Sequence, residues 1–135
     1  MPVTVNIVEG GHVIEVRISD PWTTEELLAV QSVTRPHRAS VDFPVHSLLN
    51  VRGTWNVPPG VLRGRHMPAF SSSSRGYIAV VGGGGLVRMM FDVVRRLVNF
   101  ERVSYFQTDE EAWAFLRQLI VEEQKSPATE HQQSD

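Results

Sequence analysis

Segments with strand periodicity alternate with segments of helical periodicity along most of this chain, and this order constrains the fold more than any other feature. Apolar and polar residues alternate over 3–7 and over 14–18, and Gly10 and Gly11 between them suit a tight turn, which predicts an antiparallel hairpin. Further strands are predicted over 45–51, 77–81 and 103–107.

Helices are predicted between and after these strands. Thr23 or Thr24 can cap the first one, and Pro36 should end it near Thr34 or Arg35, because proline disfavours helical geometry in the residue before it. The order β-β-α-β-α-β-α-β-α predicts an α/β fold with an open, mostly parallel sheet and an antiparallel hairpin at its edge. Loops are expected over 37–44 and 71–76, and the other helices over 59–66, over 86–99 and from Thr108 on.

The final helix and the chain end set the predicted domain limits. Thr108 and Glu111 have the spacing of a capping box, and apolar residues then fall on one helical face. From Gln124 on the sequence is polar and contains a proline. With 135 residues in all, one domain over 1–123 and a disordered tail over 124–135 are predicted.

Charge and targeting signals limit the function. The net charge is −2, yet residues 31–107 hold ten arginines and three acids, which could face an anion, a lipid headgroup or an acidic partner. The simpler alternative is that these arginines lie scattered and pair with the acidic chain ends. No recognition-helix motif is evident, so nucleic acid is not an expected partner. Neither a secretory signal nor a membrane span is predicted, and a cytoplasmic location is expected, which the absence of cysteine suits.

Three segments carry a resemblance to a known family. These segments are SLLNVRG (47–53), YIAVVGGGGLVRMMFDVVRRL (77–97) and VSYFQTDEEAWAFLRQLI (103–120). The first is similar to the third strand of STAS domains, and the second is similar to their fourth strand, glycine loop and following helix. The third is similar to their final strand and helix. STAS domains occur in sulfate transporters and anti-sigma-factor antagonists, and the likeness is closest to small bacterial STAS-like members. The resemblance implies this family's α/β fold and a non-catalytic regulatory module that binds a protein partner.

The resemblance also implies where a regulatory switch would lie. Anti-sigma antagonists are switched by phosphorylation of a serine in an Asp-Ser-Ser-Gly-like motif at the start of the second helix. Here the corresponding stretch is 50–55, where Asn50 stands for the aspartate, no serine is present and Thr54 is the only nearby hydroxyl. The turn over 53–55, with Thr54 and Trp55, is the candidate partner-binding turn.

A glycine run after a strand is the second candidate binding site. A strand, four glycines and a helix could cradle an anion with backbone N–H groups, and Arg88 could add a charged contact. The alternative is a turn that needs small residues for close packing between helix and strand. Neither the phosphate-loop nor the dinucleotide pattern is complete. The residues in question are Gly82, Gly83, Gly84 and Gly85.

The helix over 86–98 is more apolar than packing on one sheet face requires. Nine of its thirteen residues are apolar, more than a stripe of about 100° needs. We expect a homodimer seam or an apolar ligand cleft beside it; the alternative is that flanking helices bury the excess. The candidates for this seam or cleft are Met89, Met90, Phe91 and Val94.

No catalytic, metal or cofactor site is predicted. None of the five histidines lies three or four residues from another, Gly-x-Ser-x-Gly is absent, and His46 is interpreted as a core residue of its strand. The leading hypothesis is a STAS-like regulatory module whose turn and glycine-loop helix face a partner or a second copy. The alternative is a module for a small apolar ligand or lipid, with Arg88 as an anionic anchor; an uncharacterised enzyme ranks third.

Overall fold

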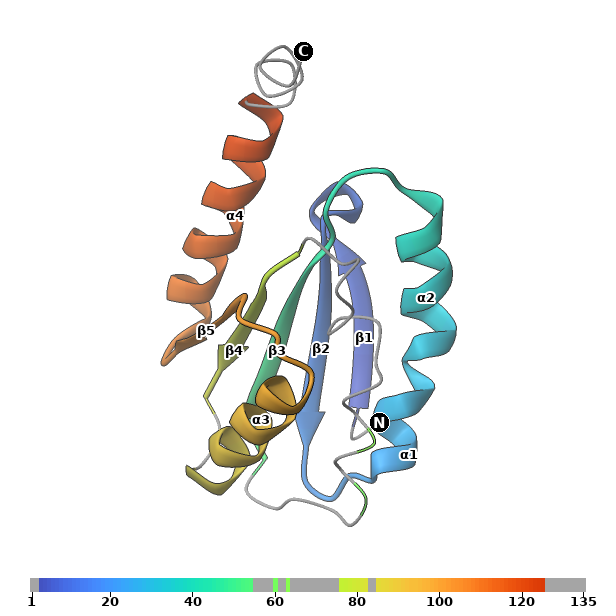
Figure 1. Cartoon of the computed structure of the whole chain (residues 1–135), viewed down its shortest axis with the longest axis vertical. Helices are drawn as coiled ribbons and strands as arrows, with labels where there is room; N and C mark the ends of the chain where they lie inside the picture. The colour runs from blue at the N-terminus through green and yellow to red at the C-terminus, as the bar shows by residue number, and fades with distance from the viewer. Residues whose placement is uncertain (1–2, 55–59, 61–62, 64–75, 83–84, 126–135) are drawn as a thin grey trace.

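A five-stranded sheet, in which each strand lies beside its neighbours in the chain, forms the centre of the molecule (Figure 1). The computed structural model describes residues 3–54, 60, 63, 76–82 and 85–125. β1 runs antiparallel to β2, and β2 to β5 run parallel, which confirms an α/β fold with a mostly parallel sheet and an opening hairpin. The strands are β1 (Val3–Val8), β2 (Val13–Ser19), β3 (His46–Gly53), β4 (Ile78–Val81) and β5 (Val103–Phe106).

The opening hairpin turns where the two glycines predict. Val8 pairs with Val13, and a short 3-10 turn (Glu9–Gly11) connects the strands. Gly10 and Gly11 have φ angles of 66° and 91°, in the left-handed region that glycine enters without steric cost.

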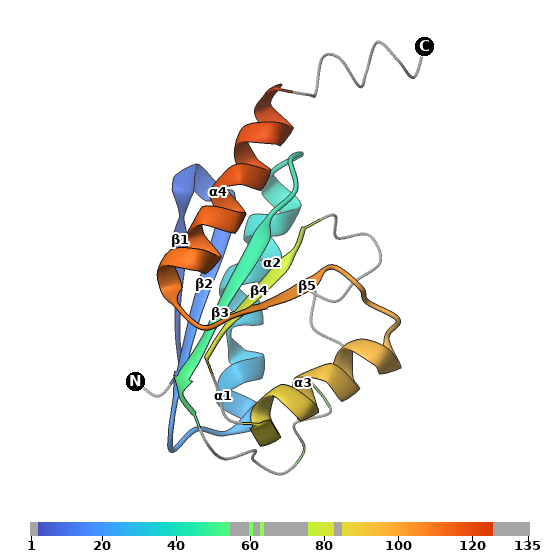
Figure 2. The ribbon, with the colours of Figure 1, turned by 90° about the vertical axis from the view of Figure 1, so that its left-hand side faces the viewer.

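Helices cover the two faces of the sheet unequally (Figures 1 and 2). Residues of α1 and α3 pack with one apolar core, which includes Ile14 and Val80. α4 packs on the opposite face against β3, β4 and β5, over a second core that includes Leu48. The helices are α1 (Thr24–Ala29), α2 (Gln31–Ser40), α3 (Gly85–Leu97) and α4 (Asp109–Lys125).

The first predicted helix corresponds to two helices, α1 and α2, which meet at Val30, and its predicted end also differs from the structure. Thr23 caps α1 and forms a capping box with Glu26. Of the two predicted caps, Thr23 and Thr24, the first is therefore confirmed.

Pro36, however, lies inside α2, so the predicted end near Thr34 or Arg35 is wrong. The loop predicted over 37–44 is wrong for 37–40, which are helical, and correct for 41–44. Contacts from beyond the proline hold the helix: Nε2 of His37 lies 2.7 Å from the Gly11 carbonyl oxygen, and Arg38 donates to the Val45 carbonyl at 3.0 Å.

On the face of the sheet that carries α4, one row of side chains changes from polar at the β1 edge to apolar at the β5 edge. One row across all five strands runs Thr4, Arg17, Asn50, Val81, Phe106. Its members on β4 and β5 are apolar, where α4 packs, and those on β1, β2 and β3 are polar. Exposure accounts for Arg17, whereas Asn50 is only 6% exposed and is held there by its hydrogen bond to Asp109 at the start of α4.

The remaining predictions concern chain segments at or beyond the described limits. α4 continues to Lys125, so helical structure extends one residue past Gln124, where the tail was predicted to begin. The rest of the predicted tail and most of the helix over 59–66 and of the loop over 71–76 lie outside the described residues. Among the described helices, none is long and apolar enough to cross a membrane.

Candidate functional site

Gly82, the first residue of the glycine run, lies in close contact with a neighbouring strand. Gly82 has a φ of 76°, and a Cβ there would collide with Cγ of Arg52. At Gly85, the first residue of α3, a Cβ would meet no atom within 4 Å. The close-packing alternative is therefore the better description of Gly82, whereas Gly83 and Gly84 lie outside the described residues.

Arg88 ties together the carboxyl ends of two strands. Its Nε donates to the Gly82 carbonyl at 3.0 Å, and its Nη2 donates to the Phe106 carbonyl at 3.2 Å. Its guanidinium also lies 5.5 Å from the centre of the Tyr105 ring. These contacts occupy the group that was predicted to anchor an anion, and they give Arg88 a structural role at the ends of β4 and β5.

Thr54 is not accessible in this structure. The residue is 0% exposed, and its Oγ1 donates a hydrogen bond of 2.8 Å to the Ile18 carbonyl. A kinase could reach this hydroxyl only after the ends of β2 and β3 separate. Trp55, the other candidate of this turn, lies outside the described residues.

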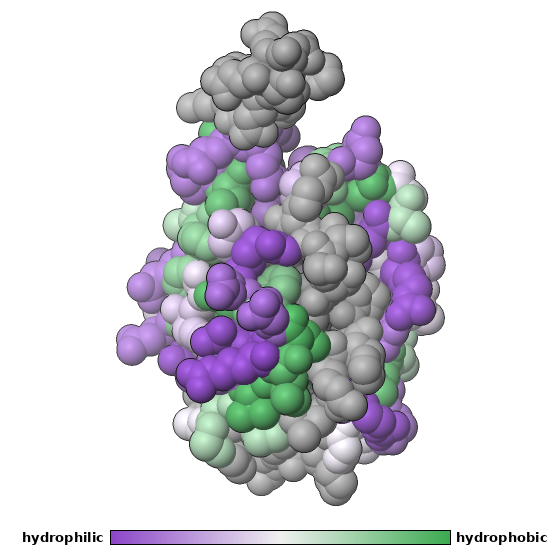
Figure 3. Space-filling view, viewed as in Figure 1, coloured by the Kyte–Doolittle hydropathy of each residue, from purple (hydrophilic) through white to green (hydrophobic). Residues whose placement is uncertain are grey.

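α3 leaves part of its apolar surface uncovered. Val94 is buried, Phe91 packs edge-on against Tyr105, and Met90 is half-buried. The exposed members are spaced four residues apart and form what we call the α3 stripe; apolar surface gathers over this helix in Figure 3. The stripe consists of Met89 (56% exposed), Val93 (39%) and Leu97 (59%). Of the four predicted residues, Met89 is exposed, Met90 and Phe91 are partly buried, and Val94 is buried.

Charged residues flank the α3 stripe. Asp92 accepts from Nε of Arg95 at 2.7 Å and from Nε of Arg96 at 3.0 Å. The second of these ion pairs joins residues four apart, which lie on one face of a helix. The Arg96 side chain remains 71% exposed, so the rim of the stripe is basic.

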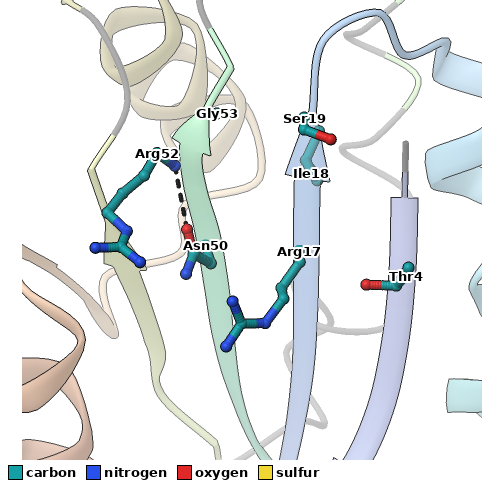
Figure 4. Close-up of a pocket in the computed structure, with 7 residues that line it drawn as sticks. All are labelled: Thr4, Arg17, Ile18, Ser19, Asn50, Arg52 and Gly53. Carbon is teal, nitrogen blue, oxygen red and sulfur yellow. Dashed lines mark hydrogen bonds between the residues drawn. The ribbon is translucent and has the colours of Figure 1, made fainter. Parts of the chain in front are cut away.

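An open cleft of about 530 Å³ lies over the carboxyl ends of β2 and β3 (Figure 4). The pairing of these strands is irregular here: Arg17 pairs with Asn50, and Ser19 pairs with Gly53, so β3 has one extra residue. Such irregularities often re-aim side chains at functional sites. The lining residues are Thr4, Arg17, Ile18, Ser19, Asn50, Arg52 and Gly53.

Two carboxylates hold the arginines of this cleft. Asp109, at the start of α4, accepts from Nη2 of Arg52 with one oxygen and from Nδ2 of Asn50 with the other, both at 3.2 Å. Glu15 accepts from Nη2 of Arg17, also at 3.2 Å. The Arg52–Asp109 pair joins the arginine-rich middle of the chain to its acidic end, as the simpler alternative predicted.

Sequence reasoning missed this cleft. A partial signal was present, because Arg17 and Thr4 both occupy the polar phase of an alternating strand of the predicted hairpin. Asn50 gave no such signal, because its strand does not alternate. What could not be derived was the register that places them in one row.

His46 lies at the opposite end of β3 and is a core residue, as predicted. It is 0% exposed, its Nδ1 accepts from the Tyr77 N–H at 2.9 Å, and its Nε2 lies 2.8 Å from Oε2 of Glu123. These contacts assign the proton to Nε2. Burial, together with the charges of His12 and Arg38, lowers the pKa of His46 to about 4.

Neither a metal-binding cluster nor a known relative points to a further site in the described part of the chain. No group of three or more His, Cys, Asp or Glu residues that could hold a metal ion occurs in the described part of the chain. No protein-family model matches the chain, and no curated protein or solved structure matches it either. The STAS resemblance thus rests on the sequence motifs alone.

Proposed function

We propose that this chain is a cytoplasmic, non-catalytic regulatory module of the STAS-like kind, which binds a partner protein through the α3 stripe. The observation that carries the proposal is the exposure of Met89, Val93 and Leu97 on one line of a helix whose opposite side packs on the sheet. Exposed apolar residues in a contiguous patch with a polar rim are typical of protein-binding surfaces.

The chemistry of the stripe defines the partner. Residues at i, i+4 and i+8 on one helix fit an apolar groove, and a basic rim with the exposed Arg96 favours acidic residues at the edges of that groove. Three side chains make a patch smaller than the ~800 Å² per partner that stable complexes bury. A transient, regulatory contact is therefore favoured over a permanent one.

The alternative of an apolar-ligand or lipid module has weaker support. Arg88, its expected anionic anchor, is engaged with two strand-end carbonyls. The cleft over β2 and β3 is lined mostly by polar residues, which suits a polar ligand better than a hydrocarbon chain.

Site-specific photo-crosslinking in cells of the source organism tests the proposal. A photoreactive residue at Val93 should give one discrete adduct, and the same residue at Val121 of α4, which is comparably exposed at 41%, should not give it. The substitution Leu97→Glu should abolish the adduct, because a charge on the stripe opposes apolar contact.

The adduct mass identifies the occupant. An adduct whose mass is the sum of this chain and a different protein supports the proposal. An adduct with twice the mass of this chain would assign the stripe to a second copy. Equal labelling at Val93 and Val121, or no adduct at Val93, would overturn it.

A further inference from the structure

We propose that the cleft over β2 and β3 is a binding site for an oxyanion of the phosphate type, held between Arg17 and Arg52. This inference is independent of the α3 stripe, because the cleft lies on the face of the sheet that carries α4. It rests on the charge, the positioning and the shape of the lining residues.

The two charged side chains that line the cleft are both cationic, and each is ion-paired with a carboxylate outside the lining. They belong to Arg17 and Arg52, and each remains 52% exposed. Their partners are Glu15 and Asp109. A guanidinium carries five N–H donors, so a single contact with a carboxylate leaves donors for a bound anion.

Both guanidiniums are held before any ligand arrives. Asp109 fixes Arg52 together with Asn50, whose own oxygen accepts from the Arg52 backbone N–H at 3.2 Å. Gly82 lets the stem of Arg52 lie close against the backbone. Glu15, with a side chain only 12% exposed, fixes Arg17. A guanidinium can bind two phosphate oxygens at once, and an arginine side chain that is already held in place loses little conformational entropy when it does so.

Neutral donors complete the cleft. In Figure 4 the Thr4 hydroxyl points toward Arg17, and Asn50 lies between the two arginines. Ser19 lies at the carboxyl end of β2, and its hydroxyl points away from both arginines in Figure 4. The volume of about 530 Å³ falls within the ~300–1,000 Å³ range of small-ligand sites, so a phosphate group and a compact organic part both fit.

Nuclear magnetic resonance with inorganic phosphate tests the site on the full chain. The Nε–H signals of Arg17 and Arg52 and the amide signal of Gly53 should shift and reach saturation. The variant with Arg17→Gln and Arg52→Gln should bind at least about tenfold more weakly. Arg117→Gln is the matched control, because Arg117 is 58% exposed and ion-paired with Glu9 at 3.0 Å outside the cleft.

The outcomes separate a specific site from general attraction of anions. Shifts that never saturate, or equal shifts at Arg117, would overturn the proposal. If the double glutamine variant does not fold, Arg17→Lys with Arg52→Lys serves instead; it keeps the charge and should still weaken binding, because lysine cannot bind two oxygens in a fixed fork.

A second arm identifies the source of the phosphate group. Vesicles of phosphatidylcholine with phosphatidic acid are sedimented with the protein. Binding that needs Arg17 and Arg52 but not Arg117 would indicate a lipid headgroup. Binding of inorganic phosphate without sedimentation would indicate a soluble phosphate compound.

Discussion

Gly82 adopts a backbone conformation that other residues reach only with strain, and it does so against the stem of Arg52. Gly82→Ala should therefore lower the free energy of unfolding by about 2 kcal/mol, since the left-handed conformation and the collision both add cost. Chemical denaturation measures the change.

Gly85→Ala is the control for that substitution. An added Cβ there meets no atom within 4 Å, and alanine favours the helix that begins at this residue. Its stability should be unchanged or higher by up to ~1 kcal/mol. Equal losses for the two variants would show that the glycine run acts through general flexibility and not through the approach of Gly82 to Arg52.

The buried His46 makes stability depend on pH. Its pKa is about 4 in the folded chain, against an ordinary value of 6.5, so between these values the unfolded chain binds a proton that the folded chain does not. Stability should fall as the pH is lowered through this window, by about 3 kcal/mol in all, and this contribution should be constant above it.

Denaturation across that pH window, together with nuclear magnetic resonance of the histidine ring, checks this expectation. The ring signal of His46 should titrate near pH 4. A midpoint near 6.5 would show instead that the contact with Glu123 offsets the effect of burial, because a carboxylate partner favours the charged imidazole.

Single residues show where sequence reasoning stops. Thr54 is a polar residue after a strand in the sequence, and only the structure shows its hydroxyl turned inward to the Ile18 carbonyl. The cleft arginines belong to strands whose register no single segment specifies. By contrast, the burial of His46 followed from its place in an apolar strand.

Among the elements, α2 depends on contacts outside itself. Its last turn follows Pro36, and Arg38 fixes that turn by donating to the Val45 carbonyl at 3.0 Å and to Oγ of Ser47 at 2.9 Å. Arg38→Ala should cost about 2 kcal/mol and should speed hydrogen exchange in the last turn of α2.

Arg35→Ala provides the comparison in the same helix. Arg35 is exposed and donates to Gln31 within α2, so its removal should change stability by less than about 0.5 kcal/mol. If both variants change the free energy of unfolding equally, the turn of α2 after Pro36 is stabilised by helix propensity and not by the hydrogen bonds of Arg38.

This helix explains one wrong prediction. The conformational preference of the residue before a proline predicts that a helix ends there. This preference does not take into account hydrogen bonds to residues outside the helix. The contacts of His37 and Arg38 overcome that preference, and a sequence without known pairings gives no sign of them. The cap at Thr23 is local, and it was predicted for that reason.

In the whole molecule, the sheet separates two apolar cores. Val30 belongs to the core beside α1 and Leu116 to the core under α4. Val30→Ala and Leu116→Ala should each destabilise, the latter by about 2–5 kcal/mol, and their effects should add within about 0.5 kcal/mol, because they share no partners.

A pair within one core should behave differently. Leu48 and Leu116 are both fully buried in the core under α4, so Leu48→Ala combined with Leu116→Ala should depart from the sum of the single effects. Urea denaturation of the single and double variants measures both cases. Additivity in this pair, or coupling across the sheet, would contradict the two-core description.

The fold class was the most predictable property of the whole molecule. Alternation of strand and helix signals, with a glycine turn in the first pair, is enough to expect a mostly parallel sheet with a hairpin. The surface of α3 was predicted only in part: an excess of apolar residues was evident, but the orientation of the helix decided that Met89 faces solvent and Val94 does not.

The strand order has a consequence for how the chain folds. Each strand pairs with the one made just before it, so the sheet can be extended in the order of the chain. Only the β1–β2 pairing closes a short loop, because β2 and β3, β3 and β4, and β4 and β5 are each separated by a long crossover. Closing a longer loop costs more entropy, so these parallel pairings should form more slowly than the hairpin. The β1–β2 hairpin can form first, and the sheet can then grow one strand at a time while the chain is still being synthesised, until α4 covers its last strands.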